Sequence, residues 1–420
     1  MIRTTSTVAQ SIGLLSLLAS PLLAQVNTVD WDSLPDTSMK SFEAVDSAGV
    51  GTYPADGYPI KMIGVLLNNP ADMLDTTPNA NEIPFNLGGQ WQVFVQTTLP
   101  GDSGGVALYM GQNYGNIPPA LTFTPAPTPD PTQSFSNAAW QAEVNRVDVD
   151  QATGHVFQAG DLVEIDAQGG LFFGGKTNVN DEHSTSPTLD FQMRLITPAY
   201  GLPAPIPLTL SSIWDNATNA VLFDPTQQSG GEHYQGDLVN LGDVHLAPNQ
   251  SANWVANGFV TIQDAAGRQL VLELGTNSQF TPANAPTGWF NATGIFDQES
   301  PSSGPYTGNY ELFVTKPTDV QTLVLPVGDA TGDGIVNGLD INAISGHWLQ
   351  TGSSIIGDVN NDGIVNGLDI NIVAGHWLQT SGGGSATTVP EPATFVLVTA
   401  GIAAAFLARR RGRCHDSRGA

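Results

Sequence analysis

Cysteine is almost absent from this chain, because Cys414 is the single cysteine among its 420 residues. No disulfide bond can therefore form within the chain, and its folded parts must be stabilised by packed cores and bound ions. Hydrophobic residues make up 40% of the sequence, which is enough for such cores and excludes an intrinsically disordered chain. The length leaves room for roughly two or three domains of ordinary size.

Basic residues are also scarce, with 13 lysines and arginines against 39 aspartates and glutamates and a formal net charge of −26. Part of the positive charge is confined to the ends, at Arg3 and at the arginines between residues 409 and 418, so the middle is more acidic still. Such a surface repels phosphate backbones, which disfavours nucleic acid as a partner, and it attracts cations. The 46 glycines and 29 prolines favour short strands joined by turns, and therefore a mainly β fold.

Long hydrophobic runs are confined to the two ends of the chain. At the N-terminus, Arg3 precedes an apolar run that ends at Ala24, a pattern typical of a secretory signal peptide over residues 1–24. A buried N-terminal helix is the alternative, but Pro21 would kink it. Residues 25–57 then form the N-terminal segment of the exported chain.

The C-terminal run, residues 393–408, lies between a Pro-Glu-Pro motif and an arginine cluster: Pro390, Glu391, Pro392, Arg409, Arg410 and Arg411. The run is long enough for a short membrane span, and the arginines would stay in the cytoplasm. This order, over residues 389–414, resembles the PEP-CTERM sorting signal of exported proteins in Gram-negative bacteria. The resemblance implies transient anchoring in the inner membrane, cleavage by an exosortase, and delivery to the cell surface, the outer membrane or the medium. An ordinary C-terminal anchor helix is the alternative.

Two near-identical segments precede this tail, at residues 328–350 and 357–379, and each begins with a loop patterned like an EF-hand. Calcium needs several oxygen ligands, which such a loop supplies around a sharp turn that requires glycine, here Gly334 and Gly363. The pattern predicts two Ca²⁺ ions; the alternative is that the Asp and Asn residues only form turns. The predicted ligands are Asp329, Thr331, Asp333, Ile335 (carbonyl), Asn337 and Asp340 in the first loop, and Asp358, Asn360, Asp362, Ile364 (carbonyl), Asn366 and Asp369 in the second.

Each loop leads into one short helix, and two loop–helix units without an entering helix resemble the type I dockerin domain, here residues 327–379. The resemblance implies a fold that depends on calcium and a cohesin module as partner. In dockerins, a small polar pair near the end of each loop is associated with cohesin specificity, whereas Gly338-Leu339 and Gly367-Leu368 stand there in this chain. The partner is therefore left open between a cohesin-like module and a cell-surface glycan.

The body of the chain contains a second repeat, in which five strand-like runs with half-buried alternation occur twice in the same order. The segments GGEHYQGDLVNL, VTIQDAAGRQLVLEL and WFNATGIF of the second unit resemble the OB-fold modules of secreted nucleases, here without a nuclease domain. Two OB-like five-stranded β-barrels are thus expected, at residues 58–198 and 236–325, with a connector at 199–235. The expected strands are 61–68, 91–96, 104–111, 160–169 and 191–196, then 236–247, 258–264, 269–275, 289–296 and 310–315.

OB barrels bind oligonucleotides or oligosaccharides on the face of their second and third strands. The second unit offers one basic residue there, Arg268, so sugar binding by Trp254, Trp289 and Tyr234 is electrostatically easier than nucleic-acid binding. Aromatic residues of this kind more often belong to a core than to a binding surface. The ligand is therefore left open.

Residues 101–105 spell GDSGG, the nucleophile motif of chymotrypsin-like proteases. That chemistry needs a histidine to activate the serine, which precedes it in that family, whereas the first histidine here is His155. His183 and His233 each adjoin a carboxylate, but the spacing gives no third metal ligand. We therefore expect a turn at residues 101–105 and no catalytic residue.

These features predict a mainly β, non-catalytic, exported protein: two OB-like barrels, a small α dockerin-like domain, a flexible linker at residues 380–388, and a C-terminal transmembrane sorting helix. A component of an extracellular polysaccharide-degrading system, as a glycoside hydrolase or its accessory, and a matrix or adhesion protein are the alternatives.

Overall fold

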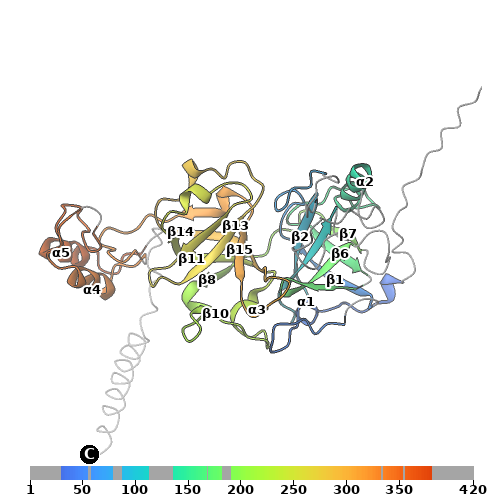
Figure 1. Cartoon of the computed structure of the whole chain (residues 1–420), viewed down its shortest axis with the longest axis horizontal. Coiled ribbons are helices and arrows are strands. Elements are labelled where there is room, and N and C mark those ends of the chain that lie inside the picture. The colour runs from blue at the N-terminus through green and yellow to red at the C-terminus, as the bar shows by residue number, and fades with distance from the viewer. Residues whose placement is uncertain are drawn as a thin grey trace, which may run out of the picture.

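The computed structural model places three bodies in a row, with an open β-sheet at one end, a β-barrel in the middle and a small helical domain at the other end (Figure 1). The expected signal peptide, the sorting signal and nearly all of the linker lie outside the described residues. No helix within the described residues is long and apolar enough to cross a membrane. The structure describes residues 30–54, 58–78, 88–112, 136–167, 169–181, 191–332, 334–352 and 355–380.

The first body is a seven-stranded sheet with the strand order β5-β6-β3-β2-β1-β4-β7. All neighbouring strands are antiparallel except β3 and β6, which are parallel. Two helices accompany it, α1 (Met39–Phe42) and α2 (Asn137–Val147), and a 3₁₀ helix (Trp31–Ser33) precedes them. The strands are β1 (Ile60–Leu66), β2 (Gln90–Thr97), β3 (Gly105–Gly111), β4 (Leu162–Ala167), β5 (Leu171–Phe173), β6 (Lys176–Asp181) and β7 (Phe191–Thr197).

The five runs expected to be strands between residues 58 and 198 are strands, but the pairings among the described residues leave this sheet open. A closed five-stranded barrel is therefore not confirmed for this unit. The sequence also gave no sign of the hairpin formed by β5 and β6. Its second strand carries Thr177, Asn178 and Asn180, which are polar although they are buried, so it lacks the apolar alternation that reveals a strand.

The second body is a closed barrel of five strands in the order β11-β12-β13-β15-β14, and β14 pairs with β11 to close it. Its β13 and β15 are parallel, and the other neighbouring pairs are antiparallel. All five strands expected for this unit are present. They are β11 (Leu238–Leu246), β12 (Phe259–Gln263), β13 (Gln269–Leu274), β14 (Phe290–Gln298) and β15 (Tyr310–Val314).

Short elements surround the barrel. Strand β8 (Ile206–Thr209) runs parallel to β11, and β16 (Val320–Thr322) pairs with β14. A hairpin of β9 (Trp214–Asp215) and β10 (Ala220–Val221) and the helix α3 (Gly230–Tyr234) lie in the expected connector. Four 3₁₀ helices complete the unit: Leu210–Ser212, Ser251–Asn253, Pro282–Asn284 and Pro317–Asp319.

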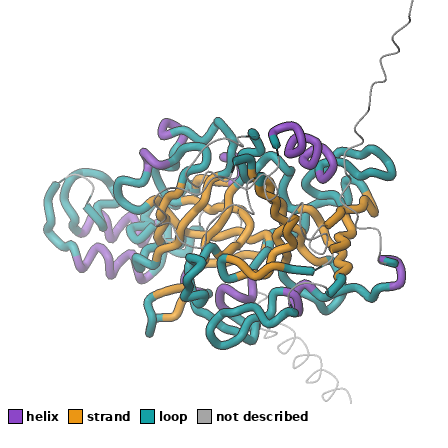
Figure 2. The backbone as a smooth tube through the Cα atoms, turned by 45° about the vertical axis from the view of Figure 1, so that its right-hand side comes forward, coloured by secondary structure: helices purple, strands orange, loops and turns teal. Residues whose placement is uncertain are grey.

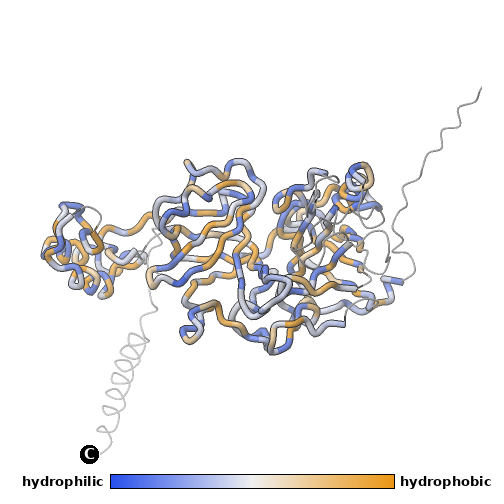
Figure 3. The backbone as a smooth tube through the Cα atoms, viewed as in Figure 1, coloured by the Kyte–Doolittle hydropathy of each residue, from blue (hydrophilic) through white to orange (hydrophobic). Residues whose placement is uncertain are grey.

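Along the barrel strands, residues that point into the core alternate with residues that point to the outer face. In β13, Leu270, Leu272 and Leu274 are buried in the barrel core, while Val271 and Glu273 point outward. Each fully buried leucine contributes about 2 kcal/mol of hydrophobic stabilisation. Apolar residues accordingly concentrate on the strands of both β bodies (Figure 3).

The sheet and the barrel pack against each other through a cluster of apolar residues that both bodies contribute. Figure 2 shows the strands of both bodies gathered in the centre, with the helices at the periphery. The backbones approach closely where Gly105 lies against Gly236, and the N–H of Gly105 donates to the carbonyl of Gln235 at 3.0 Å. The cluster contains Leu67, Met73, Phe94 and Ala107 of the first body and Leu238, Ile295 and Phe313 of the barrel.

The third body contains two short helices, α4 (Gly338–Gly346) and α5 (Gly367–Gly375). Its core consists of four fully buried residues, Val336, Ile344, Val365 and Val373. Trp348 and Trp377 lie in the turns that follow the two helices and are 46% and 47% exposed. Apolar burial within this domain is therefore small.

Candidate functional site

The two loops that precede α4 and α5 have the sharp turn expected of an EF-hand-like calcium loop. Gly334 has a φ of 80° and Gly363 a φ of 85°, a left-handed conformation that glycine adopts without strain. These are the turn positions that the sequence predicts. The repeated segments therefore fold as repeated loops.

The last predicted ligand of each loop is a fully buried aspartate. The Oδ1 of Asp369 accepts hydrogen bonds from the backbone N–H groups of Val359 and Asn360, at 3.0 and 3.3 Å, and its Oδ2 accepts one from Asn366 at 2.8 Å. Asp340 makes the corresponding contacts in the first loop. Each of these carboxylates both spans its loop and completes the capping box of the following helix.

The first predicted ligand of each loop also binds the turn. Asp358 accepts from the N–H groups of Asp362 and Gly363, at 3.1 and 2.9 Å. Asp329 accepts from those of Gly332 and Gly334, at 2.7 and 2.8 Å. The carboxylates at the two ends of each loop are thus oriented by backbone donors.

The remaining predicted ligands lie around these carboxylates. The hydroxyl of Thr331 donates to Asp340 at 2.9 Å, and the Oδ1 of Asn360 accepts from the N–H of Asp362 at 2.8 Å. The side-chain amides of Asn337 and Asn366 donate to the carbonyls of Ile335 and Ile364, at 3.3 and 3.1 Å. Asp333 lies outside the described residues.

The loops do not present a complete set of metal ligands. Within the described residues, no three His, Cys, Asp or Glu side chains converge on one point. The residue chemistry nevertheless fits calcium. Asp340 and Asp369 are fully buried, and residues 327–380 contain no lysine or arginine that could balance their charge. Buried carboxylates without a counter-charge are costly, and an oxygen-seeking cation would supply that charge.

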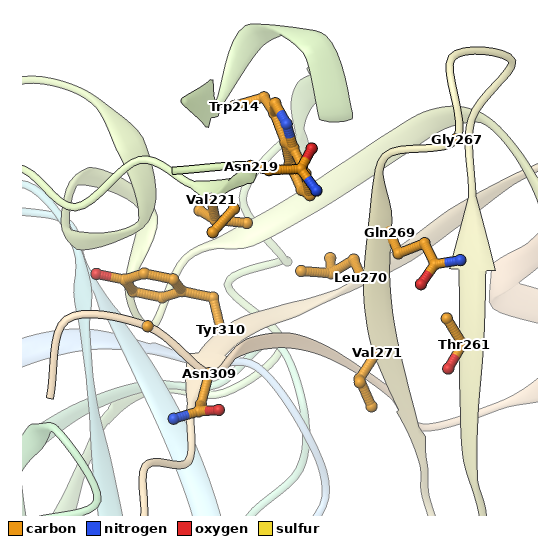
Figure 4. Close-up of a pocket in the computed structure, with 12 residues that line it drawn as sticks. Trp214, Asn219, Val221, Thr261, Gly267, Gln269, Leu270, Val271, Asn309 and Tyr310 are labelled. Atoms are coloured by element: carbon orange, nitrogen blue, oxygen red, sulfur yellow. The ribbon is translucent and has the colours of Figure 1, made fainter. Parts of the chain in front are cut away.

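A second candidate site is a cavity of about 340 Å³ on the face of the barrel formed by β12 and β13. Trp214, Asn219 and Val221 of the β9–β10 hairpin face Leu270 and Gln269 of β13 across it (Figure 4). Thr261, Asn309 and Tyr310 also line the cavity, and none of the side chains that line it is charged. Its lining combines amide, hydroxyl and aromatic groups, and its volume lies at the lower end of the range for small-ligand pockets.

A buried carboxyl positions Tyr310 in this cavity. The phenol donates to Oε1 of Glu232 on α3, at 2.6 Å. Burial raises the pKa of Glu232 to about 7. The neighbouring His233, considered from the sequence beside its carboxylate as a metal ligand, instead contacts the carbonyl of Gln227 through Nδ1, at 2.9 Å. His183 lies outside the described residues.

The aromatic residues named from the sequence do not line this cavity. Trp254 is 1% exposed and packs edge-on against Phe280 and Phe290, so it belongs to the core. Trp289 and Tyr234 are half-buried elsewhere on the barrel. The sequence missed Trp214 because its hairpin has only two-residue strands, too short for a periodic pattern.

Asp102 of the GDSGG segment binds the start of α1 and the end of β2. The carboxylate of Asp102 accepts hydrogen bonds from the Ser38 hydroxyl and the Met39 N–H at the start of α1, at 2.6 and 2.8 Å, and from the Thr97 hydroxyl at 2.9 Å. The same segment ends at Gly105, at the close approach to the barrel. His155 binds Asp161 through Nε2, at 2.7 Å.

Comparison with known proteins identifies two parts of the chain. Residues 327–374 match the family model of the type I dockerin domain, and residues 388–411 match that of the PEP-CTERM protein-sorting motif. A search of curated proteins found no match. Type I dockerins generally bind calcium and cohesin-type partners, and PEP-CTERM motifs direct exported proteins through exosortase processing to the cell envelope or surface. The chain thus carries a calcium-binding type I dockerin domain followed by a PEP-CTERM sorting motif.

Proposed function

We propose that this protein is a non-catalytic, surface-displayed binding protein of a Gram-negative bacterium. Its sorting motif is cleaved by an exosortase after transient anchoring in the inner membrane. Its dockerin domain folds around two calcium ions, one in each loop. The β-barrel binds a neutral oligosaccharide in the cavity beside Trp214.

The uncharged lining of the cavity carries the assignment of the ligand. Oligosaccharides are bound by aromatic rings that cover their apolar faces and by amide groups that bond their hydroxyls, and Trp214, Asn219 and Gln269 are of these types. Nucleic acid would require basic groups around the cavity. Arg268, at the end of the β12–β13 turn, is already bound to Asp264 at 2.7 Å.

The strand arrangement supports the same assignment. The order β11-β12-β13-β15-β14, with β13 parallel to β15, supports the OB-like interpretation of this barrel. OB barrels bind ligands on the face of their second and third strands, and the cavity lies on β12 and β13. We therefore propose the OB-like fold and the glycan site together.

Calorimetric titration of the mature protein with neutral oligosaccharides, and with single-stranded DNA as the competing class, tests this proposal. Trp214→Ala should weaken glycan binding by up to about tenfold, because an aromatic contact contributes about 0.5–1.5 kcal/mol. Tyr200→Ala is the matched control, since Tyr200 is 57% exposed and does not line the cavity. Binding of DNA in place of glycans, or equal glycan binding by both variants, would show that the assignment is wrong.

A second candidate is an accessory role in extracellular polysaccharide degradation, through a cohesin-type partner. Leu339 and Leu368, at the positions associated with cohesin specificity, are 55% and 56% exposed and therefore accessible. Leu339→Asp with Leu368→Asp should abolish calcium-dependent capture by such a partner and leave glycan binding unchanged. Loss of glycan binding in this double variant would instead place the glycan site on the dockerin.

A further inference from the structure

The two dockerin loops have nearly the same sequence but lie in different surroundings. Gly332 of the first loop is buried, whereas Asn361, at the same position of the second loop, is exposed. Both residues have a left-handed backbone conformation, with φ of 76° and 58°. The difference in burial therefore comes from what covers the first loop.

Trp289 of the barrel covers it. The indole lies so close to Gly332 that a Cβ atom there would clash with Nε1 and Cε2 of the ring. The same indole contacts the ring of His245 on β11, with centroids 4.5 Å apart and an interplanar angle of 70°. The carbonyl of Trp289 accepts a 2.7 Å hydrogen bond from the N–H of Leu323, where the connection to the dockerin begins.

Gly332 also contacts a predicted calcium ligand. Its N–H donates to Oδ1 of Asp329 at 2.7 Å, so one residue joins the ligand to the barrel. The side chain of Asn361 would not fit beneath the indole, because a Cβ atom alone already clashes there. Only the first loop can occupy this position.

We propose that Trp289 and His245 form an intramolecular seat for the first calcium loop, so that calcium in this loop fixes the dockerin against the barrel while the second loop remains free. This inference rests on the calcium binding proposed above. Calcium relieves the repulsion between the loop carboxylates and orders the turn that carries Gly332. The ordered backbone of Gly332 then packs on the indole. The two repeats are consequently not interchangeable, although their ligand residues are almost the same.

Fluorine NMR of the mature protein labelled with 5-fluorotryptophan tests the seat. The chain has eight tryptophans, and the Trp289 signal is assigned with Trp289→Phe. Calcium should shift the Trp289 signal in the wild type. The signals of Trp348 and Trp377, on the dockerin itself, report calcium binding independently of the seat.

Gly332→Asn is the decisive variant, because asparagine already occupies the equivalent left-handed position of the second loop. It should abolish the calcium-induced shift of Trp289 while the Trp348 and Trp377 signals still shift. Asn361→Gly, the reciprocal control, should behave as the wild type. A Trp289 signal that ignores calcium in the wild type, or that shifts fully in Gly332→Asn, would overturn the seat. Failure of all three signals to shift in the wild type would instead contradict calcium binding.

Limited proteolysis keeps the inference testable if Gly332→Asn no longer binds calcium. Trp289→Ala leaves the loop sequence intact and removes only the seat. In calcium, cleavage in the connection between Leu323 and Gly328 should be about tenfold faster in this variant than in the wild type, because the dockerin is no longer held against the barrel. An unchanged cleavage rate would refute the seat.

Discussion

Lys176 of β6 lies 2.7 Å from Oδ2 of Asp297 on β14, so a buried ion pair joins the sheet to the barrel. The ammonium group also contacts the carbonyl of Gln298 at 3.0 Å and Oε1 of Glu299 at 2.6 Å. Lys176 and Asp297 are each 2% exposed. Burial raises the pKa of Asp297 to about 6, although the neighbouring Lys176 charge acts in the opposite direction. The charges are thus matched only while the two bodies remain packed.

Lys176→Met should lower the free energy of unfolding by about 3–5 kcal/mol, because it leaves Asp297 buried without its partner. Lys316→Met is the matched control. Lys316 also bridges the two bodies, through Asp72 at 3.6 Å, but its side chain is 41% exposed, so its loss should cost no more than about 1 kcal/mol. Urea unfolding in calcium measures both values, and equal effects of the two changes would contradict this account.

Stability should fall as pH rises from about 5 to 8. Burial raises the pKa of Asp237 to about 7, with the charge of Asp102 adding to the shift, and burial likewise raises that of Glu273 to about 7. The folded protein therefore binds more protons than the unfolded chain between the ordinary carboxyl pKa and about 7. Protonated groups of this kind stabilise the fold at the acidic end of that window, and the contribution is lost as pH rises through it.

Asp237→Asn isolates this effect, because the amide has the same shape and does not ionise. The variant should lose less stability than the wild type between pH 5 and 8, by about 2 kcal/mol. Urea midpoints across this range give the comparison, and parallel curves for wild type and Asp237→Asn would disprove it.

The barrel was predictable because its five strands alternate cleanly between core and exterior. The calcium loops were predictable because glycine and aspartate occur at fixed positions in a local segment. The hairpin of β5 and β6 was not, since buried positions of β6 carry polar residues such as Asn178 and Asn180, which give no apolar alternation. The cavity was missed for a related reason: Trp214 and Tyr310 are distant in the sequence and meet only in the folded chain.

Calcium removal should unfold residues 327–380 and spare the sheet and the barrel. The described part of the dockerin core contains four fully buried apolar residues, too few to offset chain entropy without a bound ion. Calorimetry of residues 26–385 with and without chelator should show only the lowest-temperature transition moving. In the presence of calcium, Asp369→Ala should unfold the second loop as calcium removal does, whereas Asp264→Ala should leave it folded. If the chelator does not change the temperature of the lowest-temperature transition, the dockerin does not depend on calcium for folding.

Substitutions of Asp102 and Ser103 test whether the GDSGG segment has a structural or a catalytic role. Asp102→Ala should lower the free energy of unfolding by about 1–2 kcal/mol, because it removes the acceptor for the N–H groups of Met39 and Lys40 at the start of α1 and for the Thr97 hydroxyl. Ser103→Ala should change it by less than about 0.5 kcal/mol, as expected for a residue outside a core or a cap. Neither variant should alter hydrolysis of peptide or ester substrates relative to the wild type. If the wild type hydrolyses such substrates and Ser103→Ala abolishes that activity, Ser103 is a nucleophile and the protein is an enzyme, because loss of a hydroxyl with stability unchanged cannot act through the fold.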